Sequence, residues 1–249
     1  MGRTFAIGDI HGDLCALECL LGRLPEAKAS DTFVFTGDYL DRGPDSAGVV
    51  ARVRKLQRDS AAHVVALRGN HEDAWLRVIE SGWPEFVQPP GNGCLAAKRS
   101  FMDEPVPNPG DRPTADEREA LLHGSFFPPD VVKWLRGLPY WFEDAHAIYV
   151  HAGLPRIGGI FAHPSAVPAQ SMLLWLRDED FFRNYRGKLV VFGHTATAYL
   201  PPELSTYTPE DPADIWAGPC CVGLDTGAGK GGFLTALELP EMCVYESRF

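Results

Sequence analysis

The chain lacks the features that would place it in a membrane or on nucleic acid. No apolar run approaches the roughly 20 residues that a membrane-spanning helix needs. The amino-terminal segment has neither the long apolar region nor the small-residue cleavage site of a signal peptide. The formal net charge of -10 disfavours any nucleic-acid partner that requires a broad basic surface. We therefore expect a cytoplasmic protein that binds neither membranes nor nucleic acid.

The cysteines follow no pattern of a zinc site or a redox pair. There are six, and no two of them are separated by two residues as in a CxxC motif: Cys15, Cys19, Cys94, Cys220, Cys221 and Cys243. We expect buried, reduced thiols and no disulfide framework.

The length and composition are those of one globular domain. A chain of 249 residues with 45% hydrophobic and 22% charged residues can bury a sizeable core, and we predict a single domain over residues 1–249. Between residues 81 and 130 the hydrophobic periodicity weakens and many prolines interrupt it, with helices expected only at Thr114–His123 and from Asp130 to Gly137. We predict a proline-rich insert here, either a lid over a site or surface packing on the sheet.

The first third of the chain repeats the order strand, loop, helix. Predicted strands are Thr4–Ile7, Thr32–Thr36 and His63–Leu67, and the helices that follow them are Asp13–Leu24, Pro44–Arg58 and Glu72–Glu80. This order predicts right-handed crossovers and a largely parallel sheet, whose loops after the strand carboxyl ends gather at one edge.

Later in the chain the pattern favours strands. They are predicted at Tyr140–Glu143, His146–Val150, Leu189–Phe192, Cys221–Leu224, Phe233–Leu239 and Met242–Glu246, the last two as a hairpin. We expect them to form a second, more antiparallel sheet stacked on the first, with helices outside. The predicted fold is α/β, a four-layer α/β/β/α sandwich with two mixed β-sheets.

Five strand ends carry side chains suited to metals and phosphate. Each follows a short apolar run: GDIHG (8–12), GDYLDRG (37–43), RGNHE (68–72), HAGL (151–154) and FGHT (192–195). A single histidine at a strand end is more often a hydrogen-bonded structural residue than a ligand. Five such junctions in one chain reverse that expectation and predict a site for hard or borderline divalent metals and a phosphate.

These five motifs, in this order, resemble those of the calcineurin-like metallophosphoesterases, specifically the phosphoprotein phosphatase superfamily. The match spans Gly8 to Thr195, and the segments Leu173–Arg177 and Leu224–Gly227 are similar to those of bacterial-type members. The resemblance implies a two-sheet sandwich flanked by helices, in agreement with the strand and helix pattern.

The resemblance also implies a dinuclear metal centre at the strand carboxyl ends. Asp9 and His11 would bind the first metal, and Asp38 would bridge to the second. The remaining ligands of the second metal would be Asn70, His151 and His194. Carboxylate, amide and imidazole ligands suit two divalent ions such as Mn²⁺, with iron or zinc as alternatives.

Four further residues would act on the substrate. The resemblance implies attack on phosphorus by metal-activated water, with His71 as the general acid and Asp41 orienting His71 and keeping it protonated. Arg42 and Arg177 would bind the phosphate. As an alternative, Arg42 could pair with Asp41 or Asp45, and Arg177 could pair with the acidic residues at 178–180.

Three neighbouring features are interpreted as structural. Glu72 is expected to cap its helix or orient a neighbour rather than bind metal. Arg68 is interpreted as structural too. The glycine-rich segment Gly227–Gly232 fails the P-loop pattern and is predicted to be a turn before the last hairpin.

The motifs leave three functions open. The first is a metal-dependent phosphomonoesterase acting on phosphoserine or phosphothreonine in phosphoprotein or phosphopeptide substrates, which the complete Asp-Arg-Gly and Asn-His-Glu motifs favour. The alternative is a dinucleoside polyphosphate hydrolase of the diadenosine tetraphosphate type, whose members resemble this chain but commonly carry Asp where Glu72 stands. The third, an inactive phosphate-binding module, is disfavoured because every ligand position and His71 are intact.

Overall fold

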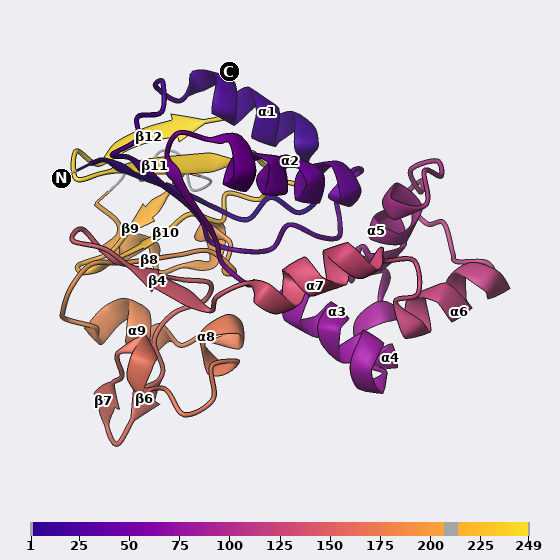
Figure 1. Cartoon of the computed structure of the whole chain (residues 1–249). Helices are drawn as coiled ribbons and strands as arrows, with labels where there is room; N and C mark the ends of the chain where they lie inside the picture. Colours follow the sequence, from indigo (N-terminus) through magenta and orange to yellow (C-terminus); the bar gives the residue numbers. More distant parts are fainter. Residues whose placement is uncertain (1, 207–213, 249) are drawn as a thin grey trace.

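Two five-stranded sheets dominate the structure, a computed structural model that describes residues 2–206 and 214–248 (Figure 1). The strands are β1 (Thr4–Ile7), β2 (Thr32–Phe35), β3 (His63–Ala66), β4 (Trp141–Glu143), β5 (Ile148–Val150), β6 (Arg156–Ile157), β7 (Ile160–Phe161), β8 (Val190–Phe192), β9 (Trp216–Ala217), β10 (Cys221–Gly223), β11 (Thr235–Leu239) and β12 (Cys243–Glu246). The first sheet has the order β12-β11-β1-β2-β3 and the second β4-β5-β8-β10-β9, while β6 and β7 form a separate small hairpin.

Helices cover the outer faces of both sheets. They are α1 (Leu14–Arg23), α2 (Ser46–Asp59), α3 (Asn70–Ser81), α4 (Pro84–Val87), α5 (Cys94–Phe101), α6 (Ala115–His123), α7 (Pro129–Gly137), α8 (Met172–Trp175) and α9 (Glu179–Asn184), with short 3₁₀ turns η1 (Pro90–Asn92), η2 (Pro164–Ala166), η3 (Thr197–Tyr199) and η4 (Pro202–Leu204). Figure 1 shows α1 and α2 over the first sheet, α8 and α9 beneath the second, and α3 to α7 to one side. The predicted α/β/β/α layering is confirmed.

Alternating side chains build the layers from the sequence upward. In β1, Phe5 and Ile7 pack in the cluster beneath the helices, whereas Ala6 between them packs between the two sheets. In β8, Val190 and Phe192 face the outer cluster of the second sheet, and the intervening residue faces the first sheet. Strands buried on both faces need apolar residues at every position, which explains the continuous apolar runs.

Strand register brings the site-bearing loops to one edge. In the first sheet β1, β2 and β3 are parallel, with Ile7 beside Phe35 and Phe35 beside Ala66. In the second sheet Gly223 lies beside Phe192. Because the carboxyl ends of these strands are level, the loops after them meet at a common edge.

The first three helices start within two residues of their predicted positions, at Leu14, Ser46 and Asn70. The Asp13 carboxylate caps α1 by accepting from the Ala16 N–H at 2.9 Å. The second helix begins at Ser46 rather than at Pro44, because the Asp45 carboxylate accepts from the Gly48 N–H at 2.8 Å and is itself the N-cap.

The segment from 81 to 130 is more helical than predicted. Instead of one irregular stretch followed by a helix, it contains α4, η1, α5 and α6. Some of its prolines lie at helix starts, as Pro84 does in α4, where a missing N–H costs nothing, whereas Pro105, Pro107 and Pro109 lie in an irregular stretch between α5 and α6. A capping box formed by Thr114 and Glu117 starts α6. Its organisation as an insert of a single domain stays a prediction.

The last hairpin joins the first sheet, not the second. The expectation that it extends the second sheet is wrong, because β11 pairs antiparallel with β1, Thr4 lying beside Leu239. All five residues of β11 are buried, as fits an interior strand between β1 and β12. The second sheet is mixed rather than mainly antiparallel, since β5, β8 and β10 are parallel and only its edge pairs are antiparallel.

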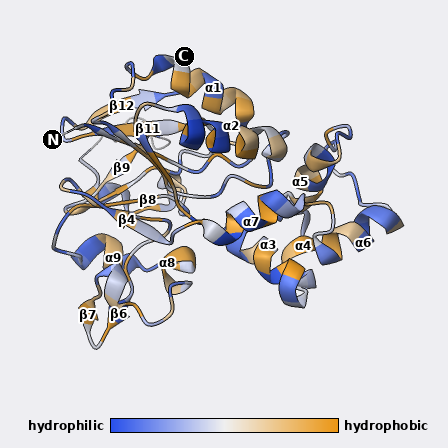
Figure 2. Cartoon of the chain, in the orientation of Figure 1, coloured by the Kyte–Doolittle hydropathy of each residue, from blue (hydrophilic) through white to orange (hydrophobic). Residues whose placement is uncertain are grey.

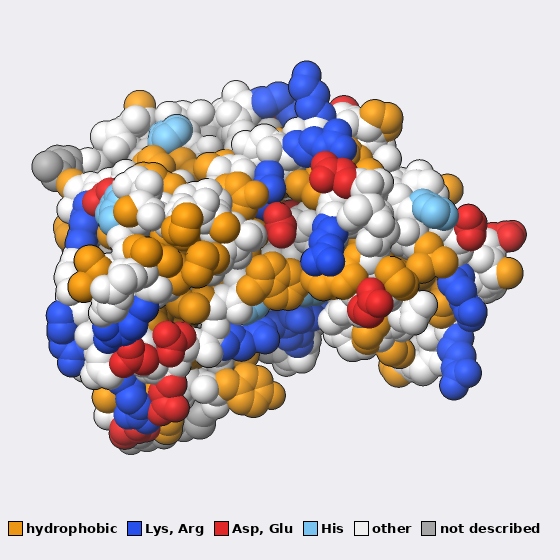
Figure 3. Space-filling model, turned by 90° about the horizontal axis from the view of Figure 1, so that it is seen from below, with side chains coloured by type: hydrophobic (Ala, Val, Ile, Leu, Met, Phe, Trp, Pro, Cys, Tyr) orange, Lys and Arg blue, Asp and Glu red, His pale blue; other side chains and the backbone are white. Residues whose placement is uncertain are grey.

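The helices are amphipathic, and the surface carries charged and hydrophobic side chains together. Figure 2 shows hydrophobic and hydrophilic bands on helices such as α3 and α7. Figure 3 shows acidic and basic side chains interspersed with hydrophobic ones on the face seen from below. Among residues 2–206 and 214–248, no helix is both long and apolar enough to cross a membrane. All six thiols are free; Cys94 and Cys221 are buried as predicted, but Cys15 and Cys243 are exposed.

Candidate active site

Six loops at the common edge converge on a cluster of buried polar side chains. The first sheet contributes loops after β1, β2 and β3, and the second sheet contributes loops after β5, β8 and β10. The predicted ligands on these loops are all at most 5% exposed: Asp9, His11, Asp38, Asn70, His151 and His194. A buried group of carboxylates and imidazoles is costly unless the groups are paired or bind metal.

One half of the cluster gathers around the Asn70 side chain. Its amide oxygen lies 2.9 Å from Nε2 of His151 and 2.9 Å from Nδ1 of His194. Nδ1 of His151 donates to the Thr36 carbonyl at 2.8 Å, which leaves a lone pair on Nε2 when the ring is neutral. Burial lowers the pKa of His151 and lowers the pKa of His194 to about 2, so both rings are neutral.

The Asn70 amide oxygen and the two ring nitrogens therefore converge, and the neutral His151 ring directs the lone pair of Nε2 at that oxygen. In addition, Nε2 of His194 is buried with no hydrogen-bond partner among the described residues. A divalent cation would stabilise such an arrangement, and the oxygen and nitrogen donors fit manganese, iron or zinc. Together with Asp38, whose Oδ1 is 3.5 Å from Nε2 of His151, this set can hold a metal ion.

The other half of the cluster gathers around His11. Nδ1 of His11 donates to the Leu40 carbonyl at 3.0 Å, which orients Nε2 toward the carboxylates as in a metal-ligating histidine. That Nε2 lies 3.4 Å from Oδ2 of Asp38 and 4.0 Å from Oδ2 of Asp9. Burial lowers the pKa of His11 well below its usual value, so this ring too is neutral.

Asp38 is the residue common to both halves. Its Oδ2 faces His11 and its Oδ1 faces His151, the position that a bridging carboxylate requires. Oδ1 also accepts from the backbone N–H of His71 at 3.0 Å. Burial acts to raise the pKa of Asp38, but the positive charge of a protonated His71 and the hydrogen bond from the His71 backbone N–H act to lower it.

Asp9 is oriented differently from the other carboxylates. Both of its oxygens accept from the backbone N–H of His194, at 3.0 and 3.1 Å. Burial raises the pKa of Asp9 well above its usual value, and the nearby carboxylates of Asp225 and Asp38 add to this, whereas Lys230 opposes it. This concentration of negative charge is a second reason why the cluster fits cations.

Strained backbone marks the same loops. Five of the seven described residues other than glycine that have positive φ angles lie here: His11, Asp38, Asp41, Arg42 and His194. Left-handed conformations of such residues cost free energy and persist where the surroundings hold them, often at functional sites. Glycine is required at the close approaches, since a Cβ at Gly193 would lie 2.0 Å from Oδ1 of Asp9.

Glu72 holds the strained loop after β2. Its buried carboxylate accepts from the N–H groups of Gly69, Asp38 and Tyr39, each at 2.9 Å, and from that of Leu40 at 3.3 Å. It thus caps α3 and fixes the backbone around the bridging carboxylate. The prediction that Glu72 caps its helix is confirmed. Arg68 is structural as predicted, donating to carbonyls at the end of α7.

His71 and Asp41 form a buried pair beside the ligand cluster. Nδ1 of His71 lies 2.6 Å from Oδ2 of Asp41, and the Trp75 indole donates to both oxygens of Asp41 at 3.0 Å. Burial acts to lower the pKa of His71, but the Asp38 carboxylate and the hydrogen bond to Asp41 raise it above its usual value. Nε2 remains available, 4.0 Å from Oδ2 of Asp38.

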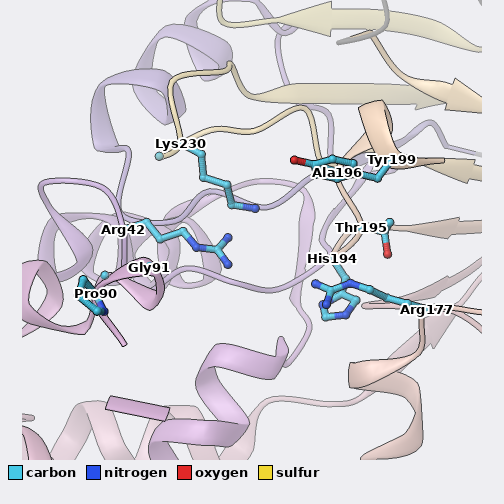
Figure 4. A pocket seen from close by; sticks show the side chains of 11 residues that line it. Arg42, Pro90, Gly91, Arg177, His194, Thr195, Ala196, Tyr199 and Lys230 are labelled. Atoms are coloured by element: carbon cyan, nitrogen blue, oxygen red, sulfur yellow. The ribbon is translucent and has the colours of Figure 1, made fainter. Parts of the chain in front are cut away.

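The two predicted phosphate-binding arginines line one cavity of about 740 Å³. Figure 4 shows Arg42 on one side of it and Arg177 beside His194 on the other. Among the described residues Arg42 forms an ion pair with neither Asp41 nor Asp45; its guanidinium instead donates to Nε2 of His11. Arg177 is exposed and, in the part of the chain that the structure describes, forms no ion pair with residues 178–180, of which Asp178 caps α9, Glu179 binds Arg183 and Asp180 binds Arg156.

Two residues in this region were not predicted as site residues. Asp225 follows β10 and is fully buried, and Lys230 lines the cavity from the segment interpreted as a simple turn. The available signal was Leu224–Gly227, a sixth apolar strand followed by Asp. The ten predicted side chains lie at this same edge, and their individual roles stay predictions.

The chain matches the family model of the calcineurin-like phosphoesterases over residues 2–198. Curated proteins similar to this chain include the symmetrical bis(5'-nucleosyl)-tetraphosphatases of several bacteria. That of Chromohalobacter salexigens is 32% identical over 61% of this chain and 45% of the relative, and that of Neisseria meningitidis 29% over 74% and 55%. That of Methylococcus capsulatus is 25% identical over 94% and 91%. The chain spans about half the length of the first two.

Solved structures share the fold. A protein provisionally described as a diadenosine tetraphosphatase aligns with a TM-score of 0.59 and 23% identity, over 98% of this chain and 92% of that one. A metallophosphoesterase from Sphaerobacter thermophilus aligns with a TM-score of 0.55 and 16% identity, over 99% and 88%. The family model covers every strand end that bears a predicted ligand, and the chain therefore belongs to the calcineurin-like phosphoesterase family.

Proposed function

We propose that this chain is a metal-dependent hydrolase of dinucleoside polyphosphates. The observation that carries the proposal is the cavity of about 740 Å³ beside the ligand cluster, with cationic side chains on both of its sides. A chain of linked phosphates needs positive charge along its length, whereas a phosphomonoester needs it at one point. The names of the curated relatives support the same substrate class.

The proposed metals are two divalent ions, with Mn²⁺ expected. Asp9, His11 and Asp38 would hold the first, and Asp38 with Asn70, His151 and His194 the second. Bound there, the ions would supply Lewis acidity at the phosphoryl oxygens and lower the pKa of a water molecule.

The protein's own groups would bind the phosphate and supply the proton. Arg42 and Arg177, on opposite sides of the cavity, would bind the phosphoryl group and stabilise its charge. As the water oxygen bonds to phosphorus, the bridging P–O bond breaks, and Nε2 of His71 donates a proton to the departing oxygen. Asp41 positions the imidazole and favours its charged form. Symmetrical cleavage of a tetraphosphate would consume one water and release two nucleoside diphosphates.

The protein phosphatase hypothesis loses one of its supports. Glu72 was a reason to favour phosphoserine and phosphothreonine, yet its carboxylate contacts buried backbone N–H groups and does not line the cavity. A residue in that position does not select the substrate by contact. The names of the curated relatives therefore favour a dinucleoside polyphosphate over a phosphoprotein as the substrate. Phosphopeptides serve as the competing substrates in the test.

The test is a comparison of substrates in the presence of Mn²⁺. Purified protein is incubated with diadenosine tetraphosphate and with phosphoserine, phosphothreonine and phosphotyrosine peptides, and kcat/KM is measured for each by chromatography or phosphate release. We expect the dinucleotide to be preferred and to yield ADP. Preference for a phosphopeptide would overturn the proposal. Two bound metals per chain without turnover of any ester would instead support the inactive-module hypothesis.

A further inference from the structure

Lys230 lies on a loop that is pressed against the ligand cluster. Residues 227–232 lead from β10 back to β11, and the Gly227 carbonyl closes the loop by accepting from the N–H groups of Lys230 at 3.0 Å and Gly232 at 2.9 Å. Gly229 has a φ of +71°, and a Cβ there would lie 2.3 Å from the His11 carbonyl oxygen. The backbone bearing Lys230 is therefore held directly beside a predicted metal ligand.

A buried carboxylate orients the Lys230 side chain. Its Nζ donates to Oδ2 of Asp225 at 3.1 Å, and Oδ1 of Asp225 accepts from the Gly227 N–H at 3.1 Å. The Asp225 side chain is fully buried, whereas that of Lys230 is 28% exposed. One ammonium N–H is used in this pair, and the other two, which have no partner among residues 2–206 and 214–248, can bind an anion in the cavity.

The cavity thus has more cations than one phosphate group requires. Figure 4 shows Lys230 and Arg42 extending from one side and Arg177 with His194 on the other. The arginine fork fits a single phosphoryl group with paired hydrogen bonds, whereas lysine acts as a point charge on a flexible stem. The point charge suits a neighbouring phosphate whose position shifts along a chain.

The geometry points to Lys230 as the binding residue for a second phosphate of the substrate, next to the one under attack. This subsite makes the cavity selective for linked phosphates over phosphomonoesters. The inference rests on the proposed function for its natural substrate, but its chemistry can be probed with inorganic anions alone.

The experiment compares two inorganic inhibitors of p-nitrophenyl phosphate hydrolysis at fixed free Mn²⁺. Inhibition constants are measured for orthophosphate and for tripolyphosphate with the wild type, Lys230→Met, Lys230→Arg and Lys133→Met. Lys133 is exposed on α7 and outside this cavity, so its substitution is the matched loss of one positive charge. Metal chelation by tripolyphosphate acts in solution and affects all four proteins alike.

We expect Lys230→Met to raise the inhibition constant for tripolyphosphate about tenfold more than that for orthophosphate, as befits the loss of one charge-assisted contact. Lys230→Arg should retain most of the selectivity because it keeps the positive charge, whereas a purely structural role for the lysine would change the two inhibition constants alike in Lys230→Met. Equal changes for the two anions in Lys230→Met, or the same ratio in Lys133→Met, would overturn the inference.

The two proposals fail separately. If diadenosine tetraphosphate is cleaved well but the ratio of the two inhibition constants is the same in Lys230→Met and the wild type, the subsite is wrong and the proposed function stands. If the ratio depends on Lys230 but the dinucleotide is a poor substrate, the subsite stands and its natural polyphosphate is another one.

Discussion

Replacing His71 by Asn removes the proposed proton donor while keeping its neighbours in place. The Asn side-chain amide can occupy the position of Nδ1 and keep the hydrogen bond to Asp41, which is 2.6 Å long in the wild type. Trp75 holds Asp41 from the other side. What is lost is Nε2, the titratable atom that faces the cluster.

The size of the effect depends on the leaving group. Protonation of a departing oxygen by a positioned acid is worth roughly 10²–10⁴-fold in rate, or about 3 to 5 kcal/mol of activation free energy. The leaving group of an alkyl phosphate is a strongly basic alkoxide, so hydrolysis of this substrate by His71→Asn should be slowed by the full factor. An aryloxide or a nucleoside diphosphate is much less basic, so His71→Asn should slow p-nitrophenyl phosphate and diadenosine tetraphosphate by only about tenfold or less.

The assay measures kcat for an alkyl phosphate, an aryl phosphate and the dinucleotide in the wild type and in His71→Asn, with metal content determined on the same samples. His63→Asn is the matched control, since His63 is exposed on β3 and lies outside the cluster. Equal losses on all three substrates with two metals still bound would refute the role of His71 as the leaving-group acid.

Three further predictions concern the same loops. Asp38→Asn should reduce bound metal to below one ion per chain because the carboxylate faces both halves of the cluster, whereas Asp41→Asn should keep both ions and lower kcat; elemental analysis of the two variants checks this. The pKa of His71 is raised, so its acid form persists above the usual histidine range, and turnover of alkyl phosphates should fall as pH rises through that pKa. In Asp41→Asn this fall should occur at lower pH. A pH profile of kcat that is the same in Asp41→Asn and the wild type would contradict the pairing of the two residues. Glu72→Gln turns an amide group toward buried N–H donors and should lower the free energy of unfolding by about 2 kcal/mol or more, measured by urea denaturation, while Glu85→Gln at an exposed position of α4 should have little effect.

Local sequence pattern predicted the parts of the fold that local physics determines. The apolar runs of β1, β2 and β3 and the helices that follow them are visible in sequence because burial on two faces and helical periodicity leave direct marks. The strand-end motifs predicted which side chains meet, since parallel strands bring their carboxyl ends to one edge.

Features that depend on distant partners were not predicted. The pairing of β11 with β1 joins Thr4 to Leu239, and no local signal specifies which sheet a hairpin joins. In the insert, the same proline that interrupts a periodic pattern also starts a helix at Pro84. Lys230 was not predicted as a site residue because its glycine-rich surroundings indicate a turn but do not indicate that the turn packs beside the active-site cavity.

The position of β1 in its sheet has a consequence for how the protein is made. One side of β1 pairs with β2, which is synthesised soon after it, but the other side pairs with β11, which comes after every strand that carries a predicted ligand. The loop of Asp9 shares this dependence, because the Gly8 N–H donates to the Thr235 carbonyl at 3.1 Å. A nascent chain on the ribosome would therefore hold an unpaired strand edge, a known hazard for aggregation. We expect metal capture and final closure of the first sheet to come late in biogenesis, after β11 has emerged.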